Sequence, residues 1–175
     1  MACLLTSGRE LPCKTSVGGL KAVYFADYGT LGDVTLVGGE ITAIAGTPDF
    51  YKYDIKGSSS LETAITSSRE NGTTFYTQTL NLTLTTLDKE TQEQIKLLSV
   101  SRPHIAVEDY NGNFFLVGLE HGSEVTGGSI ASGASMADAS SFSLTFEAME
   151  KSPANFTVST VVTANQSAVQ INPNA

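Results

Sequence analysis

Residues 120–146, EHGSEVTGGSIASGASMADASSFSLTF, combine a segment rich in Gly, Ser and Ala with a following segment in which apolar and polar residues alternate. In the alternating segment, Phe142, Leu144 and Phe146 are separated by Ser and Thr, and this period of two residues predicts a half-buried β-strand. The preceding segment, about residues 120–140, is rich in Gly, Ser and Ala and has too few large apolar side chains to form a core. We therefore predict a rigid sheet that carries a flexible extension, and we expect this extension to order against another molecule.

The same alternation is longest at Thr73–Thr85, TTFYTQTLNLTLT. Tyr76, Gln78 and the three leucines fall on one face of the predicted strand, whereas Thr and Asn residues fall on the other. A slip of one residue would move every leucine into water, so the register of this strand is firmly set.

Short alternating segments separated by turn residues fill most of the remaining chain. Gly38-Gly39 and Asn111-Gly112 each lie between two such segments and predict tight hairpins. The predicted strands are residues 21–28, 33–37, 40–45, 50–55, 61–68, 73–85, 105–110, 113–119, 142–149 and 156–163. Many short strands joined by turns indicate an all-β sandwich or barrel.

One helix is predicted, from Asp88 to about Val100. Asp88 is a suitable N-cap residue, and an apolar stripe at helical spacing includes Ile95 and Leu98. Pro103 follows and ends the helix. A single helix cannot build the repeated βαβ units of a parallel sheet, so we expect it to cover an open end or flank of the β-structure.

Length and composition place the chain as one β-sandwich domain, residues 1–175. An irregular arm of about residues 1–19 precedes it, and a polar arm of about residues 164–175 ends it. The net charge is −8 with only ten Lys and Arg, which argues against a protein that reads DNA sequence through a basic patch. Because no signal peptide or apolar run of about 20 residues is present, we expect a soluble protein made in a cytoplasm, without membrane insertion.

Catalytic patterns are weak. His104 and Asp109 could join one of many serines, but the G-x-S-x-G motif of a nucleophile elbow is absent. The Gly-rich stretch 127–133 lacks the Lys of a phosphate-binding loop. Glu147 and Glu150 are a pair of carboxylates of the kind that any acidic chain contains by chance. We expect no catalytic residues and no enzymatic activity.

Metal and cofactor patterns are equally thin. Cys3 and Cys13 can be reduced thiols, a disulfide or part of a metal site, and their spacing does not match a zinc motif. Glu108 and Asp109 beside the second hairpin turn could bind calcium, or could simply be a solvated turn. We expect no metal-binding residues and no cofactor.

The order of the predicted elements forms a larger pattern: a long two-faced strand, a helix, a tight hairpin, a Gly-rich extension and a last strong strand. Short motifs accompany it, namely Cys3-Leu4-Leu5-Thr6-Ser7-Gly8, Cys13, Val17-Gly18-Gly19-Leu20-Lys21, Gly118-Leu119-Glu120-His121-Gly122, Thr126-Gly127-Gly128, Gly133 and Leu144-Thr145-Phe146. In these features the chain resembles the tail tube proteins of long-tailed bacteriophages and small virion proteins of phages that infect Bacteroidetes. It departs at Ala137-Asp138-Ala139-Ser140, where the related pattern has Gly-Asp.

The resemblance implies a β-sandwich with a flanking helix and no catalytic residues. Six copies would join their sheets into one barrel, and the resulting rings would stack through arms and loops into a channel that conducts DNA. The implied partners are other copies of the chain, other tail or connector proteins of the virion, and genomic DNA that passes without specific binding. The implied location is the virion tail, after synthesis in the host bacterial cytoplasm. The alternative function is a capsid decoration, or a virion module that binds carbohydrate or the host surface.

Overall fold

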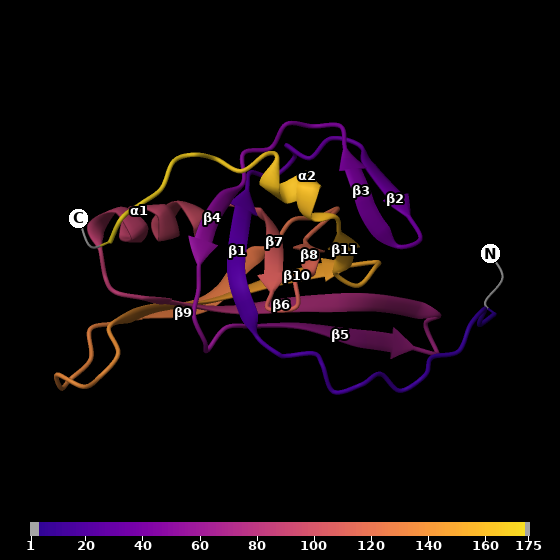
Figure 1. The fold of residues 1–175 in the computed structure, drawn as a ribbon, viewed down its shortest axis with the longest axis horizontal. Helices are drawn as coiled ribbons and strands as arrows, with labels where there is room; N and C mark the ends of the chain where they lie inside the picture. The colour runs from indigo at the N-terminus through magenta and orange to yellow at the C-terminus, as the bar shows by residue number, and fades with distance from the viewer. Residues whose placement is uncertain (1–3, 174–175) are drawn as a thin grey trace.

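The computed structural model describes residues 4–173, and it is mostly β-structure (Figure 1), with 44% strand and 9% helix. Two sheets pack together and a helix lies at their flank, which confirms the predicted all-β sandwich with a flanking helix. No helix within residues 4–173 is both long and apolar enough to cross a membrane.

The larger sheet has seven strands. In spatial order these are β2 (Val34–Val37), β3 (Glu40–Ile44), β11 (Asn155–Thr157), β8 (Phe114–Val117), β7 (His104–Asp109), β1 (Leu20–Ala26) and β4 (Tyr51–Asp54). Neighbouring strands are antiparallel except β11 and β3, which run parallel. The hairpins at Gly38-Gly39 and Asn111-Gly112 are confirmed, since they join β2 to β3 and β7 to β8.

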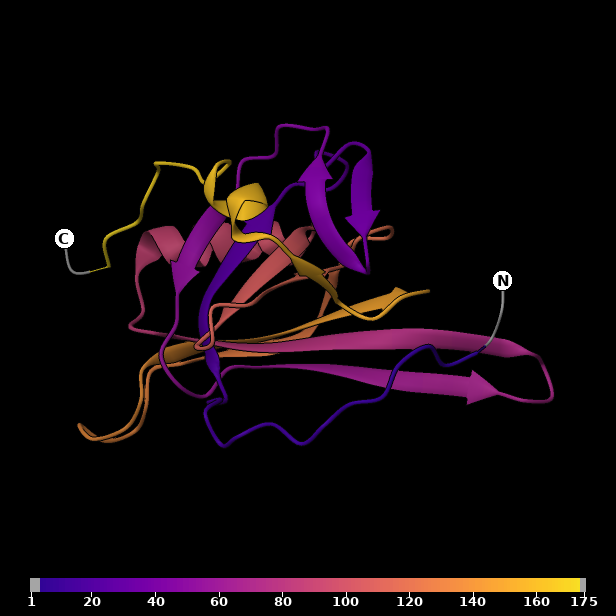
Figure 2. The ribbon, with the colours of Figure 1, turned by 45° about the vertical axis from the view of Figure 1, so that its right-hand side comes forward.

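The smaller sheet has four antiparallel strands. Their order is β5 (Ser60–Ser68), β6 (Thr73–Thr85), β10 (Ser141–Glu150) and β9 (Glu124–Ala131). Strand β6 has the predicted bounds, and Leu82 pairs with Leu144 in the register that buries both apolar faces. The strands of this sheet cross those of the larger sheet steeply (Figures 1 and 2).

The main core lies between the two sheets. Each sheet contributes one face of alternating apolar side chains, and the buried members include Val23, Phe25, Ile105, Val107, Leu80, Leu82, Phe142, Leu144 and Phe146. A second cluster covers the other face of the larger sheet and includes Tyr24, Ile41, Phe50, Leu116 and Val162. The larger sheet is therefore buried on both faces, whereas the smaller sheet is buried on one.

Helix α1 (Lys89–Leu98) confirms the predicted helix. The side chain of Asp88 accepts a hydrogen bond from the backbone N–H of Thr91 at 3.0 Å, which satisfies one donor of the first turn. Ile95 is buried in the main core, and Leu98 packs against it, so the helix covers one flank of the sandwich.

The prediction that residues 120–140 form a flexible extension is wrong for Glu124–Ala131, which are strand β9 paired along β10. The small side chains here fit a strand that packs closely against its neighbour. A Cβ atom added at Gly128 would lie 2.6 Å from the carbonyl oxygen of Ser143. Only residues 132–140 remain as a projecting loop (Figure 1).

The strand predicted over residues 156–163 is also partly wrong. Strand β11 is short and ends at Thr157, and helix α2 (Ser159–Thr163) follows it. The β-branched residues of this segment favour a strand. In the helix, however, Val161 and Val162 are both buried, with Val162 in the cluster on the second face of the larger sheet. Tertiary packing therefore overrides the local preference.

The described parts of both terminal arms lack helices and strands beyond the elements named above. Residues 4–19 run beside β5 toward one end of the long axis of the molecule (Figures 1 and 2). Helix α1 and residues 164–173 lie toward the other end, where Phe50 and Gln166 form an isolated parallel bridge. The two arms thus leave the body in opposite directions.

Candidate functional site: the open face and edges of the smaller sheet

The outer face of the smaller sheet, opposite the core, is polar and uncovered. Among residues 4–173, neither helix packs on this face (Figure 1). Its side chains are mainly hydroxyl-bearing, and they include Ser60, Thr66, Thr77, Thr79, Thr83, Ser129, Ser141, Ser143 and Thr145. The four strands contain four Glu residues and neither Lys nor Arg. The strands of this face therefore carry negative charge and contribute no cation of their own.

Three of the four glutamates fall in one row across the sheet. Glu62 lies opposite Thr79 on β6, and Glu147 lies opposite the same threonine from the other side. Glu124 on β9 lies opposite Glu147. Like charges directly opposite each other on neighbouring strands are destabilising. Among the three, and within residues 4–173, Glu124 alone forms an ion pair, with Arg102 Nε at 3.5 Å from its carboxylate.

Strands β5 and β9 are the two edges of this sheet, and each carries one Glu, with a register shift where β9 pairs with β10. Each pairs with a neighbour on one side only. Natural edge strands are commonly guarded by Lys, Pro or a short length. The segments SLETAITSS and EVTGGSIA contain no Lys or Pro and are nine and eight residues long. Within residues 4–173, no backbone hydrogen bond joins the N-terminal arm to β5. Within residues 4–173, neither edge strand therefore has a second strand hydrogen-bonded to it, although the N-terminal arm runs beside β5.

The loop of residues 132–140 has a defined conformation of its own. The carboxylate of Asp138 accepts hydrogen bonds from the backbone N–H groups of Ala134 and Ser135 at 2.9 and 2.8 Å. These bonds lower the pKa of Asp138, with that from Ser135 contributing most. Met136 lies fully exposed on this loop. The loop therefore exposes an apolar side chain on a backbone that these hydrogen bonds hold in one conformation.

The structure separates the histidine and aspartate of the possible catalytic arrangement. His104 and Asp109 lie at opposite ends of β7. The Nδ1 atom of His104 is 2.6 Å from the carbonyl oxygen of Gly118, and its Nε2 accepts the backbone N–H of Gly29 at 3.1 Å. The ring is buried and stacks on Tyr28. With both nitrogens occupied, His104 is a structural residue of the core.

The burial of His104 predicts a pH dependence of stability. Burial lowers the pKa of His104, so the unfolded chain takes up a proton near pH 6.5 that the native protein does not. The contribution of His104 to the free energy of unfolding should therefore be nearly constant above about pH 7 and fall as the pH drops from 7 to 5, by at most about 1.4 kcal/mol per pH unit. Chemical denaturation at several pH values measures this slope. His104→Gln should flatten it, whereas removal of the exposed histidine by His121→Gln should not; an unchanged slope in His104→Gln would contradict the assignment.

The carboxylates considered for calcium binding have protein partners. The Glu108 carboxylate accepts hydrogen bonds from Lys21 Nζ at 2.6 Å and Tyr24 Oη at 2.9 Å. Burial tends to raise the pKa of Asp109, but hydrogen bonds from Asn113 and Asn111 lower it overall. Both side chains therefore stabilise the β7–β8 hairpin and its neighbour β1.

The remaining candidates are dispersed. Cys13 is exposed, and Cys3 lies outside the described residues, so a bond between them is untested. Gly127 lies within strand β9, whereas Gly133 belongs to the loop that follows it. The glycine-rich stretch therefore does not form a compact phosphate-binding loop. Glu147 and Glu150 are three apart on β10 and therefore point to opposite faces.

The structure brings together one acidic cluster that the sequence did not indicate. Ligand atoms of Glu120, His121 and Glu150 lie within 4.8 Å of one another. The buried Glu150 carboxylate accepts the backbone N–H groups of Glu120 and His121 at 3.0 and 2.8 Å. Glu120 also forms an ion pair with Lys151 at 3.6 Å. These contacts explain the cluster as an anchor for the turn before β9.

Comparison of the chain with protein-family models, with curated proteins and with solved structures finds no match.

Proposed function

We propose that this protein is the structural subunit of a bacteriophage tail tube, in which stacked homo-oligomeric rings, each of six copies, form a channel that conducts DNA. The observation that carries the proposal is the smaller sheet, which has two edge strands that each pair on one side, one buried face and one open acidic face. The resemblance of the sequence to tail tube proteins adds the ring number and the role in a virion. No enzymatic activity is part of the proposal.

The strand directions suit closure into a ring. Each of the three strand pairs in the order β5-β6-β10-β9 is antiparallel, so β5 and β9 run in opposite directions. Rotation about an axis that runs roughly along the strands leaves the direction of each strand unchanged from one copy to the next. The β5 edge of one copy then meets the β9 edge of the next copy in antiparallel pairing. Closure would leave no free edge in this sheet.

The size of such a barrel fits a DNA channel. Six copies of the four-stranded sheet supply 6 × 4 = 24 strands. At a spacing of about 4.8 Å between strands, these enclose a circle about 37 Å across between backbones, and strand tilt widens it further. Barrels of 16 to 18 strands already leave an aqueous channel. We infer that the open face lines the bore, because the core holds the other face against the larger sheet.

The row of Glu62, Glu147 and Glu124 would then become a belt around the bore. Three carboxylates from each of six copies make 3 × 6 = 18. A duplex carries one negative charge for about every 1.7 Å of its axis, and a wall rich in Lys or Arg would bind many phosphates at once. An acidic wall repels the duplex over roughly 8 Å at physiological salt and so keeps it centred and mobile.

Electron microscopy of the purified protein, together with its mass in solution, tests the proposal. We expect rings or tubes with a central channel. Ile65→Lys combined with Ser67→Lys places two cations on the exposed part of the β5 edge and should leave monomers. Val100→Lys with Ser101→Lys adds the same charge on an exposed site beyond helix α1 and should still assemble. A wild-type monomer, or a small closed oligomer without a channel, would overturn the proposal and favour a decoration or surface-binding module.

A further inference from the structure

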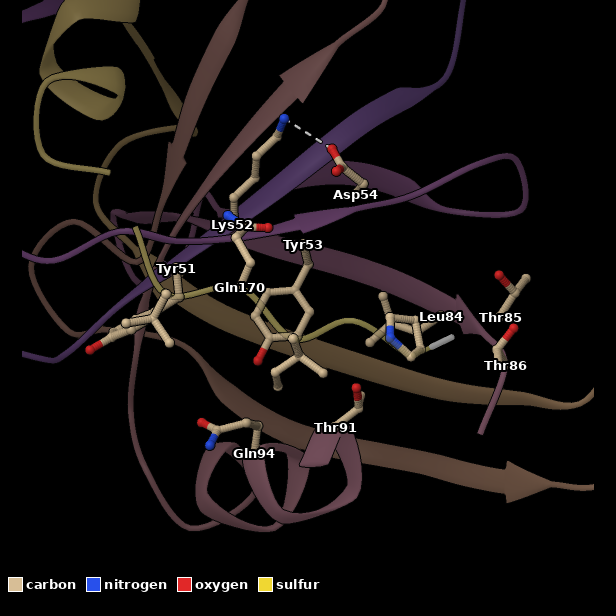
Figure 3. Close-up of a pocket in the computed structure, with 13 residues that line it drawn as sticks. Tyr51, Lys52, Tyr53, Asp54, Leu84, Thr85, Thr86, Thr91, Gln94 and Gln170 are labelled. Atoms are coloured by element: carbon tan, nitrogen blue, oxygen red, sulfur yellow. Dashed lines mark ion pairs between the residues drawn. The ribbon is translucent and has the colours of Figure 1, made fainter. Parts of the chain in front are cut away.

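A groove lies at the end of the molecule opposite the N-terminal arm. It is bounded by β4, by the end of β6, by α1 and by residues 169–173 of the C-terminal arm (Figures 1 and 3). Its volume is about 380 Å³, within the range of about 300–1,000 Å³ that is typical of ligand pockets.

The part of the groove that faces α1 is lined by uncharged side chains. Tyr53 points from β4 toward the helix and Gln94 (Figure 3). Lys52 and Asp54 extend to the other side of the strand, where they form an ion pair at 3.0 Å. The remaining lining is apolar or uncharged and includes Leu84, Thr91, Val169 and Ile171. An apolar side chain entering here would meet aromatic and aliphatic carbon without displacing a charge.

Two backbone features mark the groove as a place for a peptide. Within residues 4–173, strand β4 is an edge of the larger sheet and pairs with β1, while the C-terminal arm pairs with Phe50 directly before β4. Extended peptides commonly bind by adding a strand to such an edge. Thr86, at the rim, has a φ of +71°, a strained conformation for a β-branched residue, and strained residues cluster at binding and active sites.

The N-terminal arm carries apolar side chains that have no place to pack. Leu4, Leu5 and Leu11 are 79%, 100% and 97% exposed. Isolated exposed leucines are common on protein surfaces, but three on an extended arm leave apolar area that another surface can bury. Burial of one leucine is worth about tenfold or more in an association constant.

The arm is fastened only at its base. The side chain of Asn111, in the β7–β8 turn, accepts the backbone N–H of Val17 at 3.0 Å and donates to the carbonyl oxygen of Val17 at 2.7 Å. Residues 4–16 precede this clasp and are exposed throughout. At about 3.3 Å per residue, these 13 residues can extend about 43 Å, which equals the length of the 13-residue strand β6.

We propose that the N-terminal arm of one copy binds in this groove of a second copy and places Leu4, Leu5 or Leu11 against Tyr53 and Leu84. The arm and the groove lie at opposite ends of the long axis (Figures 1 and 2), so the contact is head-to-tail. A head-to-tail contact that does not close on itself generates a filament.

The charges of the arm and the body also favour this pairing. Residues 1–19 carry Arg9 and Lys14 against one Glu10, a net charge of +1, so the remainder carries −8 − 1 = −9. A cationic arm is attracted to the acidic body of another copy over the screening length of the solution. The contact deepens the proposed function by naming what joins one ring to the next, but it requires only two copies of the chain.

Disulfide cross-linking of the full chain tests the contact directly. In a background of Cys3→Ser and Cys13→Ser, Leu5→Cys is combined with Gln94→Cys, which lies exposed in the groove wall. Mild oxidation by a disulfide such as oxidised glutathione should give a ladder of covalent dimers and higher multimers. Leu5→Cys with the exposed Glu40→Cys on β3, far from the groove, is the matched control and should give at least tenfold less. A cross-link within one chain, or none, would overturn the proposal.

A second variant separates this inference from the proposed function. Leu5→Asp with Leu11→Asp should leave single rings but reduce their stacking into tubes at least tenfold in electron micrographs. If this variant forms tubes as long as those of the wild type, the proposed arm contact is wrong and the proposed tail tube function is retained. If the wild type forms no rings but the cysteine pair still gives the ladder, the tube is wrong and the arm contact stands.

Discussion

Phe146→Ala should lower the free energy of unfolding by about 3–5 kcal/mol, the usual cost of removing a buried aromatic side chain. Phe146 is completely buried between the two sheets and contacts Phe25, with ring centroids 5.3 Å apart. The substitution removes contacts from both sheets at once, because Phe25 belongs to β1 and Phe146 to β10. The surrounding strands are tied by their hydrogen bonds and cannot collapse to fill the cavity.

Urea denaturation followed by circular dichroism measures this loss. Phe75→Ala is the matched control, because Phe75 lies on the outer face of the same sheet and is 37% exposed. It should cost less, since more than a third of this side chain already lies in water and its removal leaves no enclosed cavity. A loss below about 1.5 kcal/mol for Phe146→Ala would show that the two sheets do not share one tightly packed core.

Glu62→Lys combined with Glu147→Lys should turn a channel that repels DNA into one that retains it. The two changes shift the charge of each copy from −8 to −4, and six copies would bring 6 × 2 = 12 lysines into the bore. Neutralising 6–10 phosphates makes affinity fall about 10³–10⁵-fold between 50 and 200 mM salt. We therefore expect short duplexes to bind the variant assembly at low salt, with a steep salt dependence, and not to bind the wild-type assembly.

The matched control moves the same charge change away from the open face. Glu40→Lys and Glu93→Lys replace exposed glutamates on β3 and α1 and give the same net charge. Binding is measured by fluorescence anisotropy of a labelled duplex on assembled protein. Equal retention by the control and the Glu62/Glu147 variant, or tight binding by the wild type, would contradict the placement of the open face in the bore.

The sequence predicts the fold best in segments whose residue pattern is compatible with a single secondary structure and register. The alternation in Thr73–Thr85 fixes which side chains are buried, because a slip of one residue exposes the leucines. The cap at Asp88 and the stripe through Ile95 fix helix α1 in the same way. These patterns are local, so they need no knowledge of distant contacts.

The errors come from segments whose structure depends on a distant partner. Strand β9 has little apolar alternation of its own and is held by pairing with β10. Helix α2 forms from β-branched residues, and in it Val161 and Val162 are both buried, with Val162 in the cluster on the second face of the larger sheet. The carboxylate row is likewise invisible in the sequence, since Glu62, Glu124 and Glu147 become neighbours only through the register of four strands.

The position of strand β11 has a consequence for how the protein is made. This strand is formed by residues 155–157, yet it lies between β3 and β8, and in the strand order of the described residues it connects the β2–β3 hairpin to the rest of the larger sheet. A chain growing on the ribosome therefore holds a hairpin without this connection until residues 155–157 have emerged. Pairings between such distant segments form slowly. Completion of the larger sheet therefore waits for residues 155–157, which form the last of its strands to be synthesised, and until then β3 and β8 each lack the neighbour that lies between them.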